Sequence, residues 1–257
     1  MVPESPWPFF ESFSLLSLTI SAVLYMHGYL NAGYYLTVGF VITAYCMALW
    51  FRDVITESTY EGFHTKEVVH GILIGFLLFI VSEAFAFLSV FWAFFHSALS
   101  PAVEIGGCWP PQGIEALNAF AIPLLNTILL LSSGAFVTFA HHSLLQGNRK
   151  RSILGNIVTI LLAIIFTSFQ GYEYIQAPFT IADSVFGSAF FASTGLHGLH
   201  VIVGTIFITI GLFRIIYYHF TTKHHTGYEA SILYWHFVDV VWLFLFIAVY
   251  YWGGSVN

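Results

Sequence analysis

Long apolar stretches alternate with short polar segments along almost the whole chain. A helix needs about 20 apolar residues to cross about 30 Å of hydrocarbon, and seven stretches approach or exceed that length. The predicted spans cover residues 10–27, 34–51, 68–97, 120–141, 153–172, 184–217 and 231–252. The pattern therefore predicts an all-α, polytopic membrane protein with seven transmembrane helices.

A polar segment separates the first two predicted helices from the other five. It divides one membrane-embedded unit into two parts, residues 1–60 and residues 61–257. No internal repeat, low-complexity linker or extramembrane domain is evident in either part. We therefore expect helices 1–2 and helices 3–7 to form two parts of a single membrane protein.

The charged residues predict how the helices are oriented. All seven basic residues fall at the connections after the second, fourth and sixth helices, which lie on one side. They are Arg52, Lys66, Arg149, Lys150, Arg151, Arg214 and Lys223. The opposite connections are expected to carry four acids, Glu104, Glu115, Glu173 and Asp183. Because basic residues remain on the inner side, we predict an inner N-terminus and an outer C-terminus.

The composition agrees with a membrane protein and excludes several functions. Apolar residues make up 58% of the 257 positions and charged residues only 8%, against about 25% charged residues in soluble domains. The few basic residues face the inner side, so nucleic acid is not an expected partner. No lysine lies within a span, and there is no Gly-rich phosphate loop or HExxH motif.

Glu83 is the only acid in the apolar run from residue 77 to residue 99. An ionised carboxylate is costly at this depth, and even an uncharged acid requires hydrogen-bond partners. Counting along the fourth span places Ser132, Ser133 and Gly134 at a similar depth, so we expect partners there. Both a functional role and a packing role remain open for Glu83.

Two further groups contain histidine. His197 and His200, at i and i+3, share one helix face, and the glycines around them indicate a close helix contact with the histidines bonded across it. Haem ligation is the alternative. His236 and Asp239 are also spaced by three, so they form either a structural pair fixing the last helix or a proton relay.

Histidines also gather at the predicted inner boundary, in "AHHSLLQGNRKR" and "HFTTKHH". Ordinary topology explains the nearby lysines and arginines. The density of histidine beside Arg214 and Trp50 makes bound anionic phospholipid an equal alternative.

Several motifs in order resemble the cytochrome c oxidase subunit 3 family, in its mitochondrial form. They are "SEAFAFLSVFWAFFHSAL", "GGCWPP", "PLLNT", "AHHSLLQGNRK", "EYIQAPFTI", "FFASTGLHGLHVIVGT" and "YWHFVDVVWLFLF". The resemblance covers roughly Trp7 to Gly254. It implies seven helices, the first two splayed from a five-helix bundle, with phospholipids in the cleft between the two parts.

The resemblance also implies a function. The family belongs to the terminal respiratory oxidase of the mitochondrial inner membrane, which reduces oxygen with electrons from cytochrome c and translocates protons. Haem and copper reside in subunits 1 and 2, so no cofactor, metal site or catalytic residue is expected on this chain. It would stabilise subunit 1, bind structural phospholipids, and support proton uptake or oxygen access.

Family positions carry over to particular residues. The lipid-contacting positions correspond to Trp50, Glu57, His64, Arg214 and His219. Glu83 corresponds to the family's membrane-embedded, carbodiimide-sensitive acid. The N-terminus would lie in the matrix and the C-terminus in the intermembrane space. The chain would contact subunits 1 and 2 and the accessory subunits.

Two other classes of protein remain as alternatives. A proton-coupled transporter would use Glu83 or the pair of His236 and Asp239, although the inverted repeats and broken helices common in transporters are not evident. A membrane haem protein would use His197 and His200.

Overall fold

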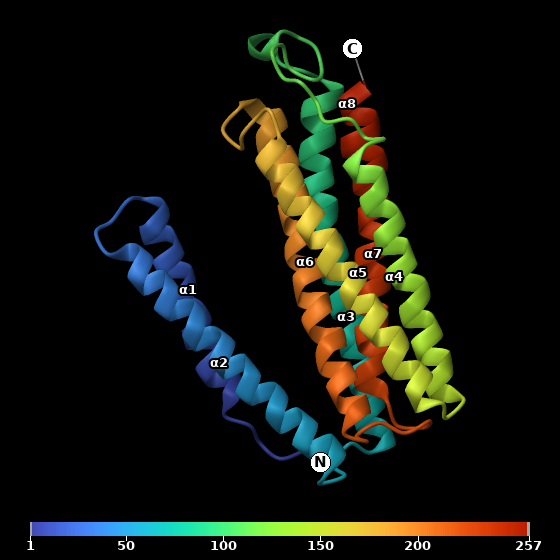
Figure 1. Ribbon diagram of the computed structural model, residues 1–257. Helices are drawn as coiled ribbons and strands as arrows, with labels where there is room; N and C mark the ends of the chain where they lie inside the picture. Colours follow the sequence, from blue (N-terminus) through green and yellow to red (C-terminus); the bar gives the residue numbers. More distant parts are fainter. Residues whose placement is uncertain (1, 256–257) are drawn as a thin grey trace. The chain divides into compact units, whose positions relative to one another are not determined.

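The computed structural model describes residues 2–255, which contain helices and no strands (Figure 1). Seven helices are long and apolar enough to cross a membrane. They are α1 (Trp7–Met26), α2 (Ala32–Thr59), α3 (Lys66–Leu99), α4 (Ile122–Leu145), α5 (Arg149–Gln176), α6 (Ser184–Ile216) and α7 (Thr226–Leu245). The prediction of an all-α chain with seven spanning helices is confirmed.

Three shorter helical elements complete the described chain. η1 (Val103–Ile105) is a single 3₁₀ turn in the connection between α3 and α4. The last spanning helix continues without a break into a π-helix, η2 (Phe246–Trp252), and ends in α8 (Gly253–Ser255).

Several helices extend beyond their predicted spans. The second was expected to end at residue 51 but continues to Thr59, where the Tyr60 amide still donates to the Thr56 carbonyl. An apolar window detects only the part of a helix that lies in hydrocarbon. Backbone hydrogen bonds can carry the helix further into the polar boundary region, so hydropathy underestimates its length.

The described residues form two compact units that divide after Ile72. In the first unit, α1 and α2 pack against each other, joined by a short turn (Figure 1). Gly39 permits the close approach, because a Cβ atom there would lie 3.2 Å from the Leu18 Cα. The Trp7 indole nitrogen also donates to the Asp53 carboxylate, which joins the start of α1 to α2.

The second unit contains the remainder of α3 together with α4–α7 (Figure 1). The most enclosed spanning helix is the last one, α7 with its continuation. In its most apolar stretch 56% of the residues are buried, against 6% in that of α3. Trp235 and Trp242 share its buried face and donate to hydroxyls on α4. The two 2.9 Å bonds reach Ser133 and Thr127, and the seven-residue spacing of the tryptophans places both on one face of the helix.

One glycine on α6 makes the predicted close helix contact. A Cβ at Gly204 would lie 2.9 Å from the Trp235 ring, so glycine allows α6 and α7 to approach. Gly198 has open space around it, and Gly195 has only the Tyr174 hydroxyl at 3.8 Å. The close contact predicted from the glycines around His197 and His200 therefore occurs at Gly204, and the prediction was wrong for Gly195 and Gly198.

Candidate functional site

Glu83 on α3 pairs with His200 on α6. The Glu83 Oε2 lies 2.9 Å from the His200 Nε2, and the two side chains are 25% and 9% exposed. The His200 Nδ1 lies 2.8 Å from the Leu196 carbonyl. A carbonyl only accepts, so Nδ1 carries the hydrogen in that bond. The contact between Nε2 and the carboxyl group therefore requires one shared proton.

The structure corrects the expected partners of Glu83. The Ser133 hydroxyl donates to the Leu130 carbonyl and accepts from Trp235, while Ser132 donates within its own helix. Gly134 faces Asp239 instead. These positions meet other neighbours because α4 packs chiefly against α5 and α7.

His197 and His200 reach two different helices. The His197 Nε2 lies 3.2 Å from the Val238 carbonyl on α7, and its ring packs 5.1 Å from the Trp242 ring. The expectation that both histidines bond across helix contacts is confirmed. Because each Nε2 has a protein partner, this geometry favours packing over haem ligation.

His236 and Asp239 lie where α7 crosses α4. The His236 Nδ1 is 3.6 Å from the Asp239 Oδ2, and the His236 Nε2 is 3.1 Å from the Thr138 hydroxyl on α4. Gly134 provides the space, because a Cβ there would collide with the Asp239 carboxylate. The group therefore links α7 to α4.

Three of the predicted lipid-contacting residues belong to the first unit. Glu57 lies near the end of α2 and His64 in the segment that follows, with 3.8 Å between the carboxylate and the imidazole Nε2. Both side chains are largely buried. Trp50 is half-buried seven residues before Glu57, on the same helix.

The other two predicted lipid-contacting residues lie in the second unit. Arg214 is in the last turn of α6, with its guanidinium group 4.1 Å from the centre of the Phe220 ring. The His219 amide donates to the Arg214 carbonyl at 3.0 Å. Burial, and then the charge of Arg214, lower the pKa of His219. A protonated His219 beside Arg214 is thus disfavoured unless an anion joins them.

One buried acid was assigned to the wrong place by the sequence analysis. Glu173 was expected in an outer connection, but it lies in α5 and is 2% exposed. Nearby, Gln170 donates to the Tyr250 hydroxyl at 3.1 Å and accepts from Asn126 at 3.3 Å. Gln170 and Glu173 are spaced by three residues and so share one face if the helix continues. This spacing was the sequence signal that Glu173 belongs to the helix.

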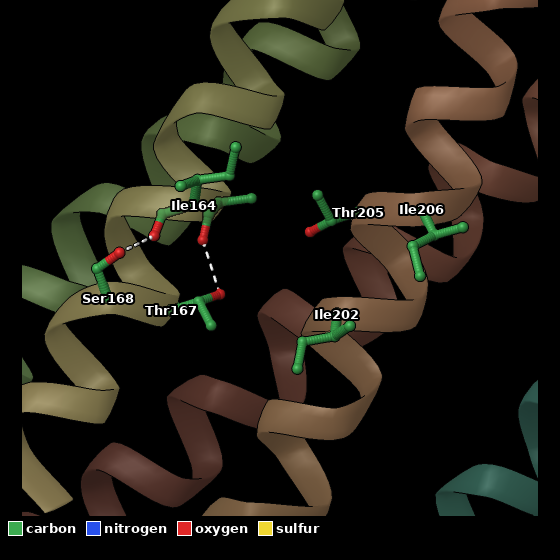
Figure 2. Close-up of a pocket in the computed structure, with 7 residues that line it drawn as sticks. Ile164, Thr167, Ser168, Ile202, Thr205 and Ile206 are labelled. Atoms are coloured by element: carbon green, nitrogen blue, oxygen red, sulfur yellow. Dashed lines mark hydrogen bonds between the residues drawn. The ribbon is translucent and has the colours of Figure 1, made fainter. Parts of the chain in front are cut away.

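A cavity of about 300 Å³ lies between α5 and α6. Figure 2 shows the side chains that line it. The hydroxyls of Thr167 and Ser168 donate to carbonyls of their own helix, as does that of Thr205 on α6. The remaining lining is alanine and isoleucine, at Ala163, Ile164, Ile202 and Ile206. The cavity is therefore apolar and contains no titratable side chain.

The fold and these sites together define a class of protein. The chain has seven membrane-length helices, and the described residues contain no separate extramembrane domain. One acid–histidine pair, Glu83 and His200, joins two helices, and a second pair on α7, His236 and Asp239, contacts α4 through Thr138. This is an integral, multi-pass membrane protein.

Comparison with known proteins identifies the family. The family model "Cytochrome c oxidase subunit III" matches residues 1–254. The cytochrome c oxidase subunit 3 of Emericella nidulans is 60% identical over 98% of this chain and 94% of its own length. The Mycosarcoma maydis protein of the same name is 60% identical over 99% of this chain and 94% of its own length. The Rhizopus stolonifer protein is 58% identical over 99% of this chain and 90% of its own length. The chain belongs to the cytochrome c oxidase subunit III family and is a subunit of a multi-subunit oxidoreductase.

Proposed function

We propose that this chain is the structural, non-catalytic third subunit of mitochondrial cytochrome c oxidase. The complex reduces oxygen with electrons from cytochrome c and translocates protons. Haem and copper are held by subunits 1 and 2, while this chain stabilises subunit 1 and binds phospholipid. Family membership over residues 1–254 carries the proposal, and it displaces the transporter and haem-protein alternatives.

The side-chain contacts are compatible with a subunit that has no redox centre. His197 and His200, the strongest haem-ligand candidates in the sequence, direct Nε2 toward Val238 and Glu83. Using them as axial ligands would break these contacts. Electron transfer is therefore assigned to the partner subunits.

Phospholipid binding is proposed at Trp50, Glu57, His64, Arg214 and His219. Arg214 offers a guanidinium group, which suits a phosphate because its donors form a planar fork. Gly227 leaves room for it, since a Cβ there would lie 2.9 Å from the guanidinium group. A phosphate would also offset the electrostatic cost of a protonated His219 next to Arg214.

The proposed location is the mitochondrial inner membrane, with the N-terminus in the matrix and the C-terminus in the intermembrane space. The placement of all seven basic residues at alternate connections supports this orientation. Within the second unit, Arg149 at the start of α5 donates to the Ile216 carbonyl at the end of α6. The basic residues of two inner connections therefore lie at one end of these helices.

One purification tests both parts of the proposal. The complex is isolated in mild detergent through a tag on this chain, and its haem spectrum, copper content and phospholipid phosphorus are measured. We expect haem and copper in the complex, haem bands lost from this chain once it is separated, and about one phospholipid fewer in Arg214→Ala. The phospholipid content of the Arg214→Lys complex should lie between those of wild type and Arg214→Ala, because lysine keeps the positive charge but loses the planar fork of donors.

Lys223→Ala is the matched control, since Lys223 is an exposed cation in the connection that follows α6 and Arg214. Haem that stays with the separated chain would contradict the structural role. Equal phospholipid in the Arg214→Ala and Lys223→Ala complexes would contradict lipid binding by Arg214.

A further inference from the structure

Three metal-ligating side chains converge where α4 ends and α7 begins. The His141 Nε2 lies 3.4 Å from the His225 Nε2, which in turn lies 3.1 Å from the Glu229 Oε1. One potential ligand atom from each residue falls within 4.8 Å of the other two. All three residues belong to the second unit, and none of them is among the proposed lipid-contacting residues.

Local structure brings the three groups together. His225 immediately precedes α7, and Glu229 follows four residues later in the first turn, so both lie on one side of the helix. His141 lies in the penultimate turn of α4 and reaches them because α4 packs against α7. The sequence showed two histidine-rich segments at one boundary but not which histidines meet.

A second hydrogen bond determines which nitrogen of His225 is available. Its Nδ1 lies 3.0 Å from the Thr221 carbonyl, which only accepts, so Nδ1 carries the hydrogen in that bond. The Nε2 of a neutral His225 then presents a lone pair to both His141 and Glu229. An N–H on His141 would satisfy the first contact, but the Glu229 carboxylate would still face a lone pair.

A cation at the centre of the three groups resolves this conflict. We propose that His141, His225 and Glu229 bind a divalent transition-metal ion, with Zn²⁺ the best match. Two imidazoles and one carboxylate form a common zinc ligand set, and bond lengths near 2.0–2.2 Å in a tetrahedron place ligand atoms about 3.3–3.6 Å apart. The two shorter separations of 3.4 and 3.1 Å are close to this range.

The surroundings have two further properties of a metal site. The bond from His225 to the Thr221 carbonyl orients the ring as an outer-shell partner does. His225 is 5% exposed, whereas the Glu229 side chain is 44% exposed. The ion would therefore be anchored on the buried side and have an open side for a water molecule as fourth ligand.

Zinc content of the intact complex tests the site. The complex is equilibrated with buffered free Zn²⁺, passed through a desalting column, and its zinc-to-haem ratio is measured by mass spectrometry. We expect one zinc ion fewer per complex in His141→Ala. Glu229→Gln should weaken binding by at least the roughly tenfold effect of losing an outer-shell partner.

His224→Ala is the matched control, because His224 adjoins His225 but is exposed and is not part of the cluster. The exposed Glu229 also allows a test without disturbing buried packing. Equal zinc contents in wild type, His141→Ala and Glu229→Gln complexes with intact haem spectra would overturn the proposal. That result would assign the central cation to a proton on His225 paired with Glu229, and would leave the subunit and lipid proposals unaffected.

Discussion

At the scale of single residues, the pair of Glu83 and His200 explains how an acid is accommodated among apolar helices. The His200 Nδ1 donates to its own helix, so the contact with Glu83 holds one proton. With that proton on either partner, the pair carries no net charge. This arrangement avoids the large cost of an isolated charge in hydrocarbon.

The shared proton predicts a difference between two substitutions of Glu83. In Glu83→Gln the amide can donate to the His200 Nε2, so the stability of the complex should change little. In Glu83→Ala that nitrogen loses its partner, which should cost about 1–3 kcal/mol. Thermal unfolding of the purified complex measures both.

Ser82→Ala is a suitable control for this comparison. Ser82 is the neighbouring, exposed residue on α3, and its hydroxyl donates only to the Phe79 carbonyl. Equal destabilisation by Glu83→Gln and Glu83→Ala would show that the contact requires the carboxyl group itself rather than a donor to His200.

At the scale of helices, two of the glycines in α6, Gly204 and Gly198, have different surroundings. A Cβ at Gly204 would lie 2.9 Å from the Trp235 ring and 3.3 Å from the Tyr234 ring, whereas Gly198 faces open space. Helix packing in membranes depends on such small residues, because they let helices approach closely. Gly204 therefore determines how closely α6 and α7 approach at this point.

Replacing each glycine by alanine tests this assignment. Gly204→Ala should destabilise the complex by about 1–3 kcal/mol, since the added methyl group overpacks a rigid aromatic contact. Gly198→Ala should be neutral or slightly stabilising, because alanine favours helix more than glycine does. Midpoints of thermal unfolding provide the comparison, and a similar loss in both variants would argue against the packing explanation.

At the scale of the whole molecule, the distribution of basic residues predicts an orientation. Opening the outer mitochondrial membrane should expose a C-terminal tag to protease while an N-terminal tag stays protected, because the proposed orientation places the basic connections on the matrix side. A soluble matrix protein serves as the control for an intact inner membrane. Protection of the C-terminal tag together with cleavage of the N-terminal tag would reverse the orientation.

The sites were predictable to different degrees. His236 and Asp239 lie on one helix at i and i+3, so their proximity followed from helix geometry. The pairing of Glu83 with His200 joins residues 117 positions apart and was missed. Helical spacing identifies residues on one face but not the neighbouring helix that this face meets.

Glu173 illustrates a different limit. A charge near the end of an apolar run resembles a loop residue, so hydropathy placed it outside the membrane helix. The backbone continues through this position to Gln176, and the side chain is buried. Hydropathy measures the average character of a window, whereas burial depends on the neighbours of each side chain.

The sequence alone determined the seven helices, the all-α fold class and the family resemblance. Helix length follows from the thickness of the hydrocarbon layer, and an isolated helix already satisfies its own interior backbone hydrogen bonds. The tertiary structure decided the partners: His200 for Glu83, Ser133 for Trp235, and His225 for His141. These contacts depend on the rotation and relative height of helices far apart in the sequence, which only their packing determines.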